Sequence, residues 1–315
     1  MRNPDTDGAR RHGRSDGAVS RPIFGLAATL LPLSLTACAS LNMGHSAGVT
    51  HSISRPAVAT APTSHIGGGG DIASLIKSSP GHAASQRVAR SAGESAQAST
   101  ANMRGAEAGE RGRFTQAIRH FDKAIALSPD YYQAYNNRAL ALVRLGRMGQ
   151  ARRDFNTAIR LKPSYGAALN GRGKLNLHQQ RFEQADADFS SAIRYRKNDA
   201  LAWFHRGMAR QGMNRHADAI ADFNRASRLH PSRNEPLLLK GRSQMALARN
   251  HEALQTFDKA ARRDRRNPEI LVLRARAAEN LKLNHQAARD YRRALKLDPR
   301  NRPARTGLRR TLGRV

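Results

Sequence analysis

The stretch ARRDFNTA, residues 151–158, recurs 34 residues later in altered form as ADADFSSA, residues 185–192. Alanine, phenylalanine and alanine are spaced i, i+4 and i+7 in both stretches, which places them on one face of an α-helix. Such a triplet occurs six times at intervals of 34 residues without an insertion, so six units fill residues 98 to 301. Each triplet predicts an α-helix that carries a small-aromatic-small stripe. The triplets are Ala117, Phe121, Ala124; Ala151, Phe155, Ala158; Ala185, Phe189, Ala192; Ala219, Phe223, Ala226; Ala253, Phe257, Ala260; and Ala287, Tyr291, Ala294.

This period and these residues resemble the tetratricopeptide repeat, a unit of two antiparallel helices. In that family, small residues at positions 8, 20 and 27 let the two helices approach, and an aromatic at position 24 fills the gap between units. The resemblance implies an all-α fold, a right-handed superhelical solenoid of six helix pairs over residues 98 to 301. A capping helix in residues 302 to 315 should cover the last apolar face. Position 8 holds Gly105, Ala139, Gly173, Gly207, Gly241 and Ala275.

A proline near the end of the unit stops the second helix in four of the six units. The third and fifth units depart from this pattern, because Lys197 and Arg265 stand in its place. The four prolines are Pro129, Pro163, Pro231 and Pro299.

Two positions of the unit change together. Position 7 is basic and position 23 is acidic in four units, for example Arg172 and Asp188, whereas the fifth unit has Lys240 and Thr256. Loss of the aspartate in the unit that also lost its arginine predicts an ion pair between the two helices of a unit. The pairs are Arg138 with Asp154, Arg172 with Asp188, Arg206 with Asp222, and Arg274 with Asp290.

The chain is strongly basic, with a formal net charge of +30. Residues 98 to 315 carry +26 of this charge, which suits an acidic partner or simply promotes solubility. Position 16, at the turn between the paired helices, is arginine in five units and has no matching acidic row. We expect these residues to form a basic edge for phosphates or carboxylates if they bind anything. They are Arg113, Arg147, Arg181, Arg215 and Arg249.

The family resemblance implies that positions 2, 5, 9 and 12 of the first helices line a concave groove. In this sequence these positions are polar at the start, apolar in the fourth and fifth units, and charged in the sixth. The apolar part fits an extended or helical peptide, although its side chains could instead pack on neighbouring helices. The predicted partner-binding residues are Asn136, Asn137, Leu140, Asn170, Lys174, Phe204, Met208, Leu238, Arg242, Met245 and Arg276.

The N-terminal region contains the only cysteine, Cys38. A basic leader and the apolar residues 23 to 35 precede it, in the order typical of a secretory signal peptide. Leu35-Thr36-Ala37-Cys38 resembles the bacterial lipoprotein signal, which implies cleavage after residue 37 and lipidation of Cys38. By resemblance, Ala39 favours the outer membrane facing the periplasm. Residues 38 to 97 would then be a lipidated cysteine followed by a flexible linker rich in Ser, Ala and Gly; the alternative is a cytosolic protein.

No catalytic arrangement is present in the sequence. It lacks HExxH and Gly-x-Ser-x-Gly motifs, and the four glycines at 67–70 are not followed by Gly-Lys-Ser/Thr. We therefore expect no enzyme activity, no cofactor and no metal. The leading hypothesis is a lipid-anchored periplasmic scaffold for envelope proteins or peptides, without nucleic acid. The alternative is binding of an anionic envelope polymer or lipid headgroup through the basic edge.

Overall fold

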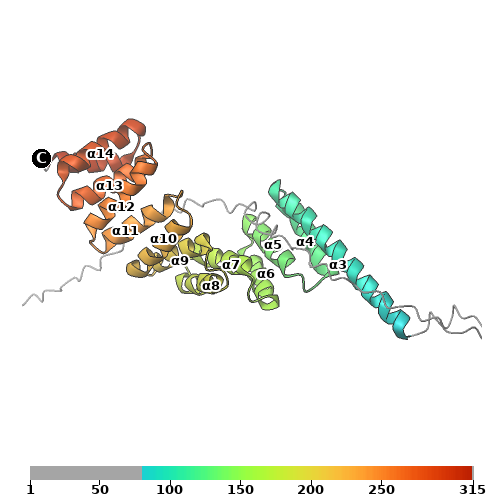
Figure 1. Ribbon diagram of the computed structural model, residues 1–315. Coiled ribbons are helices and arrows are strands. Elements are labelled where there is room, and N and C mark those ends of the chain that lie inside the picture. The colour runs from blue at the N-terminus through green and yellow to red at the C-terminus, as the bar shows by residue number, and fades with distance from the viewer. Residues whose placement is uncertain (1–79, 314–315) are drawn as a thin grey trace, which may run out of the picture. The chain divides into compact units, whose positions relative to one another are not determined.

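The computed structural model describes residues 80–313, with side chains described from residue 93 onward. Thirteen α-helices and no strand make up this part of the chain (Figure 1). The predicted signal peptide and Cys38 lie outside the described residues. Among the helices that are described, none is long and apolar enough to cross a membrane.

Each 34-residue unit folds into two helices that pack against each other, and each second helix packs against the first helix of the next unit. This arrangement confirms the predicted all-α solenoid of helix pairs. The pairs are α3 (Pro80–Glu110) with α4 (Phe114–Leu127), α5 (Tyr132–Arg144) with α6 (Met148–Leu161), α7 (Gly166–His178) with α8 (Phe182–Tyr195), α9 (Ala200–Gly212) with α10 (His216–Leu229), α11 (Glu235–Ala246) with α12 (Asn250–Arg263), and α13 (Pro268–Asn280) with α14 (Asn284–Leu297).

The helix α15 (Arg302–Leu312) closes the array, as the sequence predicted. Asn301 caps its first turn by accepting a hydrogen bond from the Ala304 backbone N–H at 3.0 Å. Ala304, Gly307 and Thr311 face the core and are buried. The helix therefore covers the apolar surface that α14 would otherwise expose.

The aromatic residue at position 24 is the centre of each unit. All six of these rings are completely buried. A glycine at position 8 makes room for the ring, because a Cβ on Gly173 would lie 2.8 Å from the Phe189 ring. In the four units with glycine at position 8, the core is thus built from a ring in one helix and a missing side chain in the other, and the position stays small in all six units.

The turn between the paired helices passes through the left-handed region at position 15 of every unit. Gly112 and Gly146 have φ near +74° there, whereas the later units place residues with a Cβ in this conformation. Those residues are Gln180, Asn214, Ala248 and Lys282. A Cβ in the left-handed region costs about 1 to 2 kcal/mol, so the turns at Gln180, Ala248 and Lys282 are strained, whereas asparagine, as at Asn214, tolerates this conformation.

The first helix is longer than the repeat predicts. It begins at Pro80, so residues 80–97, which the sequence predicted to be part of a flexible linker, are helical. The linker prediction treated alanine together with serine and glycine as a sign of disorder. Alanine has the highest helix propensity, and this segment is rich in it, so the helix extends backward from the repeat.

Candidate functional site

The first-helix face comprises the side chains at positions 2, 5, 9 and 12 of each unit. Its start is a network of amides. The Asn137 Nδ2 donates to Asn102 Oδ1 at 3.0 Å and so links the first helices of units one and two. Asn136 Nδ2 donates to Asn137 Oδ1 at 3.2 Å. Asn136 has no exposed surface, so the prediction that it forms part of an open groove wall is wrong, because its side chain lies in the interior.

Three buried amide oxygens on this face lack a donor. They are Gln133 Oε1, Asn136 Oδ1 and Asn170 Oδ1, and no donor reaches them from the described part of the chain. The Asn170 amide nitrogen is used, since it donates to Asp199 Oδ2 at 2.8 Å. An unsatisfied buried acceptor costs about 1 to 3 kcal/mol. Gln133 and Asn170 keep part of their side chains exposed, whereas Asn136 does not, so only the first two amides could turn toward an N–H donor from outside.

The fourth and fifth units supply apolar side chains to the first-helix face. Phe204 and Met208 lie one turn apart on α9, and both are partly exposed. The centroid of the Phe204 ring lies 6.0 Å from that of the buried Phe223 ring, so the Phe204 side chain packs against the core. Leu238 and Met245 on α11 pack against the Phe257 cluster and keep part of their surface exposed. Each of these four apolar side chains is therefore partly buried in the core and partly exposed to a binding partner.

The sixth unit is charged. Arg242 of the fifth unit donates to Glu269 at 2.7 Å, whereas Arg276 is exposed. A cavity of about 450 Å³ lies here, lined in part by Met245, Arg276 and Arg310. Its carboxylate, Glu279, is buried and accepts hydrogen bonds from Arg310 Nε, from Arg310 Nη2 at 2.6 Å and from the Tyr291 hydroxyl at 3.1 Å. Burial, together with the Glu279 charge, raises the pKa of Tyr291 to about 12.

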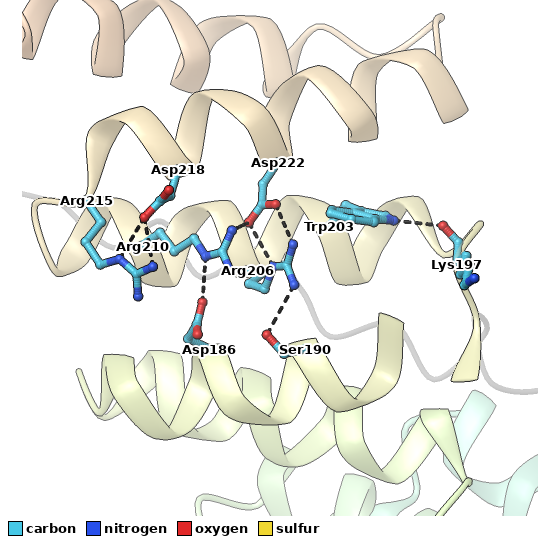
Figure 2. Close-up of polar contacts among 9 residues, drawn as sticks. All are labelled: Asp186, Ser190, Lys197, Trp203, Arg206, Arg210, Arg215, Asp218 and Asp222. Carbon is cyan, nitrogen blue, oxygen red and sulfur yellow. Dashed lines mark hydrogen bonds and ion pairs between the residues drawn. The ribbon is translucent and has the colours of Figure 1, made fainter. Parts of the chain in front are cut away.

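The predicted ion pairs between the two helices of a unit are present. Figure 2 shows the fourth unit, where Arg206 binds Asp222 through two parallel hydrogen bonds of 2.9 and 2.7 Å. Arg210 adds a contact to the same carboxylate at 3.0 Å and also binds Asp186 at 2.7 Å. The equivalent pairs are Arg138 with Asp154 at 2.7 Å, Arg172 with Asp188 at 2.6 Å, and Arg274 with Asp290 at 2.7 Å.

Each of these arginines also contacts the preceding unit, a contact that the sequence analysis missed. In the fourth unit, Arg206 Nη1 donates to Ser190 Oγ at 3.2 Å, as Figure 2 shows. One guanidinium thus joins both helices of its own unit to the second helix of the unit before. The other partners are Asp122 for Arg138 at 2.7 Å, Asn156 for Arg172 at 2.8 Å, and Asp258 for Arg274 at 3.0 Å.

The fifth unit lacks this connection. Thr256 donates its hydroxyl to Gln244 Oε1 at 2.8 Å instead of accepting from position 7. Burial lowers the pKa of Lys240, the Lys259 charge adds to the effect, and Glu252 opposes it. The joint change of positions 7 and 23 that the sequence showed therefore corresponds to a missing connection between units four and five.

The repeat geometry agrees with comparison to known proteins. The family model described as tetratricopeptide repeat matches residues 102–166, 137–185, 171–234 and 238–302. The chain belongs to the tetratricopeptide repeat (TPR) family. Members of this family mediate protein–protein interactions. No curated protein matches the chain by sequence search.

Solved TPR structures share the fold at low identity. PilF of Pseudomonas aeruginosa is 19% identical, with a TM-score of 0.59 over 71% of this chain and 100% of its own. PilW, described as a type IV pilus biogenesis factor, is 19% identical with a TM-score of 0.59, covering 67% of this chain and 98% of its own. YrrB, described as having an unusual peptide-binding site, is 18% identical with a TM-score of 0.55, covering 60% and 97%. At this identity the likeness shows the fold alone.

The basic edge lies at the start of the second TPR helices. Arg113, Arg147, Arg181, Arg215 and Arg249 are the residues preceding these helices, and none caps its helix through a side-chain hydrogen bond. All five are exposed. The sequence shows no acidic row to match them, but Arg215 does have an acidic partner, because Asp218 in the first turn of the same helix binds it at 2.8 Å.

The described residues contain no group of three or more His, Cys, Asp or Glu side chains that could hold a metal ion. The predicted groove residues Leu140 and Lys174 are partly exposed on α5 and α7. Leu140 packs against the cluster around Phe155. The residues of the first-helix face thus come from successive helices, and their use by a partner stays a prediction.

Proposed function

We propose that this TPR protein is a scaffold that binds a polypeptide segment of another cell-envelope protein along its first-helix face. The observation that carries the proposal is the pairing of two features on that face. The partly exposed residues Gln133 and Asn170 of the second and third units each have an amide oxygen without a donor, and partly exposed apolar side chains follow in the fourth and fifth units. A polypeptide would supply N–H donors to these amides once they rotate outward, and apolar side chains to the fourth and fifth units.

The comparisons are consistent with this class of activity. One protein of the same fold is described by its peptide-binding site and another as a pilus biogenesis factor. Assembly of pili or secretion systems, or presentation of peptidoglycan enzymes, would each require such a scaffold.

We further propose that Cys38 carries a lipid anchor, with the protein at the outer membrane facing the periplasm. The support is the sequence order of basic leader, apolar segment and Leu35-Thr36-Ala37-Cys38. Two or more acyl chains, at about 0.8 kcal/mol per buried methylene, anchor a protein stably. Cys38→Ser should move the mature protein out of the membrane fraction. Mature Cys38→Ser protein that still sediments with membranes would show that the anchor is absent or lies elsewhere.

The partner-binding test uses a photo-crosslinking residue at position 204, with the same residue at exposed Arg160 on a second helix as the control. We expect one defined crosslinked protein from position 204 and none from position 160. A second series places the crosslinking residue at position 174. Phe204→Ala with Met208→Ala should abolish crosslinking from this position, while circular dichroism shows that the helices persist. Unchanged crosslinking in that double variant would contradict binding at the first-helix face.

A second candidate function rests on the exposed, uncapped arginines of the basic edge. Cations at a helix N-terminus are unfavourable next to the macrodipole, so an anion bound there would be doubly stabilised. Reversal of Arg147 and Arg181 to glutamate should weaken partner capture only modestly and in a salt-dependent way. If that reversal abolishes binding while Phe204→Ala with Met208→Ala leaves it intact, the anionic-polymer function replaces the scaffold function.

A further inference from the structure

A second cavity, of about 230 Å³, lies between α12, α13 and α14, away from the first-helix face. Its floor is apolar and is formed by Ala261 and Leu271, which are both nearly fully buried. Its walls are arginines from three segments: Arg262 at the end of α12, Arg265 in the following turn, and Arg293 on α14.

The charges in this cavity are poorly balanced. Arg274 also lines it, but Arg274 is bound to Asp258 at 3.0 Å and to Asp290 at 2.7 Å. Within the described chain, neither Arg262 nor Arg265 has a carboxylate partner. Arg293 donates to the Arg265 backbone carbonyl at 3.2 Å, which holds its guanidinium near the cavity without neutralising it. Three cations therefore surround a space whose single carboxylate, Asp258, is already paired.

Two residues of this cavity differ from those at the same positions of most other units. Arg265 stands where four other units have proline, and Ala261 stands where the first three units have isoleucine. The same place between units three and four also carries three cations, Arg194, Lys197 and Arg225.

Larger side chains fill that equivalent place. Ile193 corresponds to Ala261, and Trp203 corresponds to Leu271. Trp203 Nε1 donates to the Lys197 carbonyl at 2.8 Å, and the Arg206 guanidinium lies 4.6 Å from its ring, an arrangement visible in Figure 2. Units five and six thus keep the cations of units three and four but replace two bulky side chains by smaller ones, which opens a space among the cations.

We propose that this cavity binds a phosphate group with two or more negative charges, as in a phosphomonoester or a pyrophosphate. Guanidinium groups match phosphate oxygens through paired hydrogen bonds, and three unpaired cations require more than a single negative charge. A carboxylate would neutralise only one of them. The site is independent of the partner-binding face, because none of its residues belongs to positions 2, 5, 9 or 12.

Titration calorimetry of the full chain with pyrophosphate, at constant ionic strength, tests the proposal. We expect saturable binding to a single site and no comparable heat with acetate. Arg265→Pro restores the residue that other units use at this place, and it should weaken pyrophosphate binding at least ten-fold. The matched control is Lys197→Pro, which makes the same change in the filled place and should leave the affinity unchanged.

Ala261→Ile keeps every arginine and fills the cavity, so it should abolish binding while the melting temperature without ligand is not lowered. Equal pyrophosphate affinity in the native chain and in Arg265→Pro, or equal losses in Arg265→Pro and Lys197→Pro, would overturn the proposal by showing diffuse attraction to a basic surface. Equal binding of acetate would overturn it as well.

Vesicles distinguish the two sources of the phosphate group. Sedimentation with phosphatidic acid vesicles, but not with phosphatidylglycerol vesicles of the same charge density, would assign the site to a lipid phosphomonoester, provided Arg265→Pro abolishes it. Pyrophosphate binding without sedimentation would assign the site to a soluble phosphate.

Discussion

Gly171 stands so close to Phe155 that a methyl group on its Cα would lie 2.4 Å from the ring. Position 8 of Phe155's own unit is Ala139 rather than glycine, so the room for this ring is provided by Gly171 of the next helix. The same rule holds along the repeat: where position 8 is alanine, position 6 of the next helix is glycine, as with Ala275 and Gly307 beside Tyr291. Where position 8 is glycine, the next helix carries a larger residue, such as His205 stacked at 5.5 Å on Phe189.

This relationship predicts a compensating pair of substitutions. Gly171→Ala should lower the free energy of unfolding by about 1 to 3 kcal/mol through overpacking against Phe155. Adding Ala139→Gly should recover part of the loss, because the ring gains the space that other units provide. Urea unfolding measures both variants. The control is Gly149→Ala, which meets no atom within 4 Å and should stabilise its helix by up to about 1 kcal/mol. If the double variant loses the sum of the two single-variant losses, Phe155 does not couple positions 139 and 171.

The second prediction concerns the ion pair of the third unit. Asp188→Ala leaves the Arg172 guanidinium without its carboxylate and Asn176 without the acceptor that it binds at 2.8 Å. Because Asp188 is buried, we expect a loss of about 1 to 3 kcal/mol in the free energy of unfolding. Asp218→Ala removes the partner of Arg215 in a pair that is half exposed, and it should cost less than about 1 kcal/mol. Equal costs in thermal unfolding would show that the buried pair has no special role.

His205 predicts a dependence of stability on pH. Desolvation and the nearby Lys174 charge lower the pKa of His205 to about 3, although its hydrogen bond to the Leu201 carbonyl opposes the shift. The unfolded chain takes up this proton near pH 6.5 and the folded chain does not. Its contribution is therefore complete above pH 6.5 and is lost as the pH falls toward 3, by about 1.4 kcal/mol per pH unit.

His205→Leu places the residue of the fifth and sixth units at this position and isolates that contribution. The difference in unfolding free energy between the native chain and His205→Leu should change between pH 7 and pH 4.5, to the disadvantage of the native chain at low pH. His230→Leu alters an exposed histidine and should show a smaller pH dependence. A difference that stays constant with pH would mean that His205 takes up its proton at the same pH in the folded and the unfolded chain.

The strained turn at position 15 gives a stabilising prediction. Ala248 has φ +57°, where glycine is favoured, so Ala248→Gly should raise the free energy of unfolding by about 1 kcal/mol. Gly146→Ala is the reverse change in the second unit, at φ +74°, and should destabilise by a similar amount. Thermal unfolding of the two variants provides the measurement, and a melting temperature that moves in the same direction for both would contradict the backbone explanation.

The sequence predicted the helix pairs and the Arg172–Asp188 type of contact, because both depend on residue types that recur at fixed spacing. It did not predict the contact from Arg172 to Asn156 in the preceding unit, because position 25 varies between Asp122, Asn156 and Ser190. Carboxylate, amide and hydroxyl oxygens accept the same hydrogen bond at this position. A comparison based on identical residues does not detect them.

The phosphate cavity was missed for the opposite reason. Its arginines were visible in the sequence, but the space among them depends on the sizes of Ala261 and Leu271. Charge counts alone favoured the basic edge at position 16. The arginines of both places are exposed, but Arg262, Arg265 and Arg293 line a cavity of about 230 Å³. Volume, rather than charge, separates the two places.

The missing connection at Lys240 has a mechanical consequence. From the second unit onward, every unit except the fifth is fastened to its predecessor by a guanidinium that also closes its own helix pair. Under tension along the array, units four and five should separate first, because only apolar packing and weaker polar contacts join them at that place. Phe204 and Met208 lie on one side of this joint and Leu238 and Met245 on the other. A polypeptide bound by all four side chains would therefore hold units four and five together where the contact between neighbouring units is weakest.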